Sequence, residues 1–127
     1  MIKYLVFLVV ACNGTPTGST GSTCPTTNAP TYRSFGQPFF ATYCSGCHSR
    51  DGDDRHGAPV NLRFDTELEV RAHAREIDEV AARGPEASND DMPDMSGPVR
   101  SAPTDRERAM LGQLLACERV SPRVDER

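Results

Sequence analysis

The chain of 127 residues contains no tryptophan and only one lysine, Lys3. Arginine is therefore its only strong base beyond that point, and the formal net charge is a mild −4. Proteins that bind nucleic acids cluster basic residues and interleave them with aromatic side chains, a pattern that this sequence lacks. We therefore expect no nucleic-acid partner.

Long apolar runs are also missing from the sequence. The run Tyr4–Ala11 falls far short of the roughly 20 residues that a membrane-spanning helix needs. Its place directly after Lys3 is typical of an export signal, which we assign to residues 1–11. The small and aliphatic residues at its end precede Cys12 and resemble the lipobox of bacterial lipoproteins, so Cys12 is the predicted lipidation site.

The next segment, residues 12–31, consists mainly of Gly, Thr, Ser, Pro and Asn, with almost no apolar side chains. Such a segment cannot offset the entropy lost on ordering, and we interpret it as a flexible tether. A lipid on Cys12 places the protein on the periplasmic side of a bacterial membrane or in the cell envelope. The alternatives to a lipoprotein are a signal peptide that is cleaved without lipidation and a wrongly assigned start of the chain.

Only residues 32–118 remain for a folded domain, followed by a polar tail, residues 119–127. The hydrophobic core of so small a domain usually needs additional stabilisation, such as a disulfide or a bound cofactor. Three segments have helical patterns and none has the alternation of a strand, so the predicted fold class is all-α. The three expected helices run from Gln37 to about Cys47, from the capping box Thr66/Glu69 to Gly84-Pro85, and onward from the capping box Thr104/Glu107.

The motif Cys44-Ser45-Gly46-Cys47-His48 is the pattern by which haem is attached covalently to a protein. Two thiols on one turn can each add to a haem vinyl group, and the following imidazole then lies under the iron. The sequence thus predicts one haem c, attached through Cys44 and Cys47 and ligated by His48.

Two other interpretations of the two motif cysteines remain open. A redox-active CxxC of the thioredoxin type needs a βαβ context, and a structural zinc site needs a second pair of ligands. The sequence has no βαβ pattern, no second CxxC and no HxxxH. We favour haem attachment and keep a haem-free lipoprotein with a redox or zinc-binding CxxC as an alternative.

The surroundings of the motif resemble the class I, small monohaem c-type cytochromes over residues 34–118. Gly36 and Phe40, spaced before the motif as Gly-x-x-x-Phe, are similar to the family's N-terminal helix, where the glycine permits close contact with the C-terminal helix. The resemblance implies a small cytochrome c fold with three main helices around one haem.

The loop 57–62, Gly-Ala-Pro-Val-Asn-Leu, resembles the loop that follows the haem motif in this family. The resemblance implies that the carbonyl of Pro59 accepts the proton of the His48 imidazole, which would orient the ring and make it a better donor to iron. It also makes Leu62 a candidate contact of the cofactor.

The segment Asp91-Met92-Pro93-Asp94-Met95 resembles the family's distal-ligand segment, which makes Met92 the expected sixth ligand of the iron. A thioether favours ferrous iron and fills the site against oxygen or peroxide. Met95 is the rival thioether. His73, on the apolar face of the second predicted helix, is a further alternative, whereas His56 is expected to be a solvated side chain.

Two cysteines, Cys24 and Cys117, have no predicted role in lipidation or in haem attachment. An exported compartment permits disulfides, and no other cysteines remain for either residue to pair with. The cytochrome resemblance implies that the first and last helices cross, which would bring the two ends of the domain together. We expect a disulfide between Cys24 and Cys117, with free or intermolecular thiols as the alternative.

The expected function is that of a membrane-tethered carrier of single electrons between a redox protein donor and acceptor, as a monomer or an accessory subunit. No catalytic residue is predicted, because no substrate bond is made or broken. The competing class is a haem enzyme or a gas or redox sensor whose distal position is open or reversibly vacated. Ligation of the iron by Met92 separates these two classes.

Overall fold

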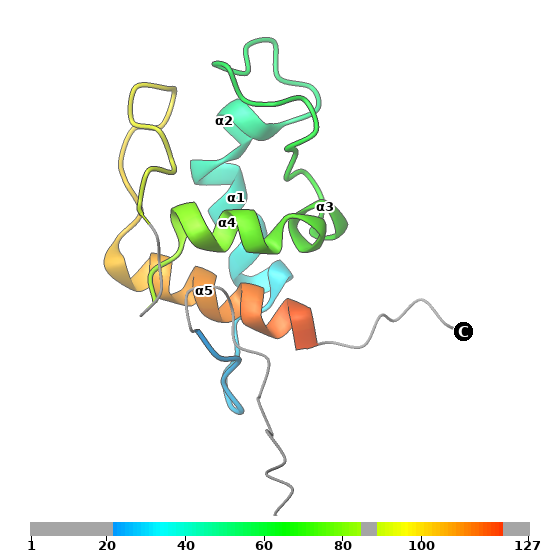
Figure 1. Cartoon of the computed structure of the whole chain (residues 1–127), viewed down its shortest axis with the longest axis vertical. Coiled ribbons are helices and arrows are strands. Elements are labelled where there is room, and N and C mark those ends of the chain that lie inside the picture. Colours follow the sequence, from blue (N-terminus) through cyan, green and yellow to red (C-terminus); the bar gives the residue numbers. More distant parts are fainter. Residues whose placement is uncertain (1–21, 85–88, 121–127) are drawn as a thin grey trace, which may run out of the picture.

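The described part of the chain, residues 22–84 and 89–120, consists of helices and loops in a computed structural model (Figure 1). No strand occurs in these residues, which confirms the all-α prediction for them. Within the same ranges, no helix is both long enough and apolar enough to cross a membrane. The predicted signal peptide, Cys12, Pro85 and residues 121–127 of the predicted tail lie outside the described residues.

The first helical region begins earlier than the sequence predicted. A π-helical turn, η1 (Tyr32–Gly36), precedes α1 (Gln37–Tyr43) and the short α2 (Ser45–His48). Thr31 and Ser34 cap it reciprocally: the Ser34 N–H donates to Thr31 Oγ1 at 3.1 Å and the Thr31 N–H donates to Ser34 Oγ at 3.2 Å. Because a serine replaces the usual Glu or Gln of the capping box, the sequence pattern does not indicate this start.

The second predicted helix is present as two, α3 (Glu67–Ala72) and α4 (Ala74–Ala81). The predicted capping box is confirmed, since the side chain of Thr66 accepts from the Glu69 N–H and that of Glu69 accepts from the Thr66 N–H. His73 interrupts the helix with φ −114° and ψ 18°. The helical region ends at Ala81, before the predicted end at Gly84-Pro85.

The last helix, α5 (Asp105–Val120), begins at the predicted capping box. The Glu107 N–H donates to Thr104 Oγ1 at 3.2 Å, and the Thr104 N–H donates to Glu107 Oε2 at 2.7 Å. Figure 1 shows α5 running alongside α4. The turn of α2 lies at the end of α1 that is farther from α5. The core between these helices includes the fully buried Phe40, Val70, Leu111, Leu114 and Leu115.

Gly36 lies where η1 contacts α5. A Cβ on Gly36 would be 2.9 Å from Leu114 Cδ2 and 2.9 Å from Tyr32 Cδ2, closer than real side chains approach. A side chain on Gly36 would therefore have to displace Leu114 or Tyr32, so the glycine permits the close contact between η1 and α5.

Replacing Gly36 by valine is expected to lower the free energy of unfolding by about 1–3 kcal/mol, because the new methyl groups overpack a buried crossing. Urea unfolding measures the change. Gly52→Val is the matched control, since the nearest heavy atom to a Cβ there would be 3.8 Å away. Equal stability of the two variants would contradict the close crossing.

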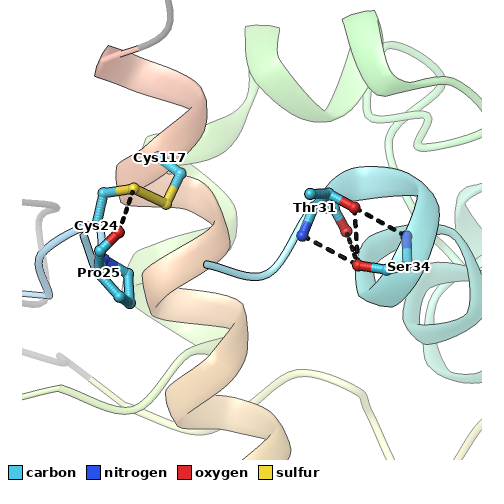
Figure 2. Close-up of a disulfide and its surroundings, with 5 residues drawn as sticks. All are labelled: Cys24, Pro25, Thr31, Ser34 and Cys117. Atoms are coloured by element: carbon cyan, nitrogen blue, oxygen red, sulfur yellow. Dashed lines mark hydrogen bonds between the residues drawn. A yellow bond between two sulfur atoms is a disulfide. The ribbon is translucent and has the colours of Figure 1, made fainter. Parts of the chain in front are cut away.

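A disulfide joins the segment before η1 to the last turns of α5 (Figure 2). The sulfur atoms of Cys24 and Cys117 are 2.02 Å apart and their Cα atoms 4.6 Å apart, as expected. The predicted tether was assigned up to residue 31, but Cys24 is bonded to the helical body, Pro30 is buried and Thr31 caps η1. Residues before Tyr32 thus contact the helical body.

Candidate functional site

The short helix α2 gathers the two motif cysteines and the histidine on one turn. The N–H groups of Cys47 and His48 both donate to the Cys44 carbonyl, at 3.1 and 2.8 Å. The two thiols are not joined to each other, and both side chains are half-buried. This local geometry presents two thiols and one imidazole to the same neighbourhood.

Neither thiol of this turn has the lowered pKa that is typical of an activated nucleophile. Burial raises the pKa of the Cys44 thiol to about 12, with a smaller contribution from the neighbouring Cys47. Burial also raises the pKa of the Cys47 thiol, aided by Asp94. Redox-active CxxC motifs depend on a lowered pKa that yields a thiolate near neutral pH. The environment therefore does not favour a redox dithiol.

The imidazole of His48 is held by two contacts. Its Nδ1 lies 2.9 Å from the Leu62 carbonyl oxygen, and its ring stacks on Phe64 with centroids 4.7 Å apart and planes 29° apart. A carbonyl can only accept, so Nδ1 carries the proton, which leaves the lone pair of a neutral ring on Nε2. This orientation and this tautomer leave Nε2 free to accept a proton or to bind a metal ion.

The structure corrects the role predicted for Pro59. The carbonyl oxygen of Pro59 accepts from the Leu62 N–H at 3.0 Å and from Arg55 Nη2 at 2.6 Å, and it is the Leu62 carbonyl that faces His48. The turn from Pro59 to Leu62 shifts the acceptor along the loop. The imidazole has the predicted backbone acceptor, but the acceptor is the carbonyl of Leu62 and not that of Pro59.

Arg55 holds the loop that carries this acceptor, a role that the sequence did not reveal. Its Nη1 donates to the Ser49 carbonyl at 2.6 Å, its Nη2 donates to Pro59 and Leu62, and its Nε donates to Ala58 at 3.3 Å. One guanidinium thus ties together both ends of the loop, including the carbonyl that orients the histidine.

Two adjoining hollows open beside α2, with volumes of about 490 and 950 Å³ including the space open to solvent. Cys44 borders the first and Cys47 the second. The first extends between Phe64 and the apolar face of α4, where Ile77 and Val80 line it. The residues that line both hollows are Tyr43, His48, Leu62, Met92 and Pro93.

Met92 and Met95 differ in where their loop places them. Met92 lines both hollows, whereas Met95 lines neither. Met95 lies at the tip of a turn closed by the Gly97 N–H, which donates to the Asp94 carbonyl at 3.1 Å. Both methionines are exposed, Met92 at 39% and Met95 at 49%, so the lining of the hollows separates them and exposure does not. Of the two methionines, Met92 is therefore the one that shares a cavity with His48.

The loop that contains Met92 packs directly on the motif turn. A Cβ on Gly46 would be 2.6 Å from Pro98 Cγ, and a Cβ on Gly97 would be 3.5 Å from Cys47 Sγ. The Met92-Pro93 peptide bond in this loop is cis. The close packing of Pro98 on Gly46 fixes the loop against α2.

The other two histidines differ from His48 in their surroundings. His73 makes an edge contact with Phe64 at a centroid distance of 6.1 Å, and it lines neither hollow. His56, expected to be simply solvated, borders the second hollow, and its backbone N–H donates to Asp54 Oδ1 at 2.8 Å. Among the described residues, no three His, Cys, Asp or Glu side chains are grouped as ligands of a metal ion.

Comparisons with known proteins add no family to this picture. No protein-family model matches the chain, and searches of curated proteins and of solved structures find no match. The function is consequently inferred from the site residues themselves.

Proposed function

We propose that this protein is a monohaem cytochrome c that carries single electrons between redox partners. The observation that supports this most is that Cys44, Cys47, His48 and Met92 border one pair of adjoining hollows. Met92 is far from the other three in sequence. The two thiols could attach a haem covalently, and the imidazole and the thioether could ligate its iron.

The residues around the hollows fit such a group. Cys44 and Cys47 would attach it, His48 Nε2 and the Met92 sulfur would ligate its iron, and Phe64, Ile77 and Val80 would shield its ring. When bound, haem supplies a one-electron couple between ferric and ferrous iron. The chain's own part is to keep the His48 ring and the Met92 sulfur in place in both states.

A carrier is favoured over an enzyme or sensor because the distal segment is fixed at its backbone. The Met92 N–H donates to the Val80 carbonyl at 3.0 Å, and the Met92 carbonyl accepts from Arg108 Nη1 at 2.8 Å. A ligand on a fixed backbone restricts the access of external molecules to the iron. A site for gas or substrate instead requires an open or easily vacated position.

Location is the second part of the proposal. The lipobox-like sequence before Cys12 supports an exported, lipid-anchored protein on the periplasmic side of a bacterial membrane or in the cell envelope. The Cys24–Cys117 disulfide is in keeping with an oxidising compartment. Metabolic labelling with a fatty acid, compared between wild type and Cys12→Ser, tests the anchor separately from the haem.

The electron-carrier proposal is tested by adding carbon monoxide to the ferrous protein and cyanide to the ferric protein. An internal ligand leaves the binding-competent state about 0.1–10% populated, so Met92→Ala is expected to raise cyanide affinity about 10- to 1,000-fold. Met95→Ala is the matched control and should resemble the wild type. Rapid binding of both ligands by the wild type would show an open distal site and overturn the carrier proposal.

A further inference from the structure

Arg108 is a buried cation on α5 whose side chain donates to backbone carbonyls outside that helix. Its exposure is only 5%. A single nitrogen, Nη1, donates to the Ala81 carbonyl at 2.7 Å and to the Met92 carbonyl at 2.8 Å. Burying a guanidinium is costly unless its donors are satisfied. The carbonyls of Ala81 and Met92 satisfy Nη1 of Arg108.

The bonds of Arg108 connect three elements that the sequence separates. Ala81 is the last residue of α4, and the Arg83 N–H, just beyond it, donates back to the Arg108 carbonyl at 3.1 Å. The Met92 N–H is already bonded to Val80 in the last turn of α4. The Met92 peptide is therefore held from one side by α4 and from the other by α5, through Arg108.

We propose that Arg108 is a positioning residue that keeps the Met92 sulfur on the haem iron, an inference that rests on the function proposed above. Hydrogen bonds from a charged donor are about twice as strong as neutral ones, and they are stronger again in a buried environment. With its carbonyl and its N–H both fixed, the Met92 backbone loses the freedom to move its side chain away. Arg108 thereby suppresses the five-coordinate state that external ligands bind.

The test uses the haem-loaded protein and Arg108→Met, which keeps an unbranched side chain but removes the charge and the hydrogen-bond donors. Loss of a charged hydrogen bond corresponds to roughly tenfold or more in an equilibrium. We expect at least a tenfold rise in the cyanide affinity of the ferric protein and a weaker sulfur-to-iron charge-transfer band. Arg108→Lys, which keeps the charge on a side chain that is shorter by one bond, should lie between Arg108→Met and the wild type.

Two controls separate positioning from general stability. Leu114→Ala removes a fully buried side chain from the same helix, so it should lower the unfolding midpoint without changing cyanide affinity. Arg106→Met makes the same substitution as Arg108→Met at an exposed position of α5 and should leave both unchanged. A rise in cyanide affinity in Leu114→Ala equal to that in Arg108→Met would overturn the proposal.

The outcomes also separate this inference from the proposed function. If the wild type carries no covalent haem or lacks the charge-transfer band, the proposed function fails. If the wild type has both and Arg108→Met keeps wild-type cyanide affinity, only the role of Arg108 is overturned. Should Arg108→Met not accumulate as a folded protein, Arg108→Lys decides, and wild-type affinity in that variant refutes the inference.

Discussion

A chain in which Cys44 and Cys47 are both replaced by alanine will carry no haem through a denaturing gel. In cells that attach haem c, the wild-type band should stain for haem peroxidase activity, because thioether bonds survive denaturation. The double variant should lose that stain completely, since neither sulfur is left to bond a vinyl group. His48 and Met92 could still bind haem in the native state, but such haem dissociates on unfolding.

The controls for this prediction come from the same chain. Cys24→Ser/Cys117→Ser also removes two cysteines, yet neither of them borders the hollows, and its band should stain like the wild type. Each single variant, Cys44→Ala or Cys47→Ala, keeps one bond and should retain part of the stain. A haem stain that follows the Cys44→Ala/Cys47→Ala polypeptide would refute covalent attachment at the motif and favour another role for the CxxC.

Local signals explain what the sequence predicted well about the fold. The capping boxes at Thr66/Glu69 and Thr104/Glu107 are formed by residues three apart, so the starts of α3 and α5 could be predicted without tertiary information. The break at His73 could not, because nothing in its neighbours stops a helix. The early start at Tyr32 depends on Ser34 in a position where Glu or Gln is expected.

The site was predictable only as far as motifs reach. The sequence identified the thiols, the imidazole and the competing methionines, because these residue types carry the chemistry. Which carbonyl faces His48 depends on the turn from Pro59 to Leu62. The choice between Met92 and Met95 likewise depends on a turn, the one that carries Met95 away from the hollows.

The contributions of Arg55 and Arg108 were beyond the reach of the sequence. Both guanidiniums donate to backbone carbonyls, which every residue possesses, so no side-chain pattern marks their targets. Arg108 reaches Ala81, which is 27 residues away in the chain. Such pairings follow from the packing of α4 against α5 and become visible only once those helices are placed.

Breaking the Cys24–Cys117 disulfide is expected to cost more stability than a typical core substitution. The two cysteines are 93 residues apart in sequence, and the chain-entropy relation for a loop of that length gives about 4.6 kcal/mol, within the general range of roughly 0–5 kcal/mol. Domains of this size have only about 5–15 kcal/mol of net stability. Cys24→Ser/Cys117→Ser should therefore unfold at a much lower urea concentration than the wild type.

The measurement is urea unfolding of the haem-loaded protein, followed by far-ultraviolet circular dichroism and by the haem absorbance. Neither cysteine borders the hollows, so the haem spectrum of the folded variant should match that of the wild type. A matching spectrum shows that the substitution changes the free energy of unfolding and leaves the haem site intact. Reducing agent should lower the stability of the wild type toward that of the variant and leave the variant unchanged. A loss below about 1 kcal/mol would mean that the reduced chain already holds residues 22–31 against α5, and that the disulfide adds little to the packing of Pro30 and the Thr31 cap.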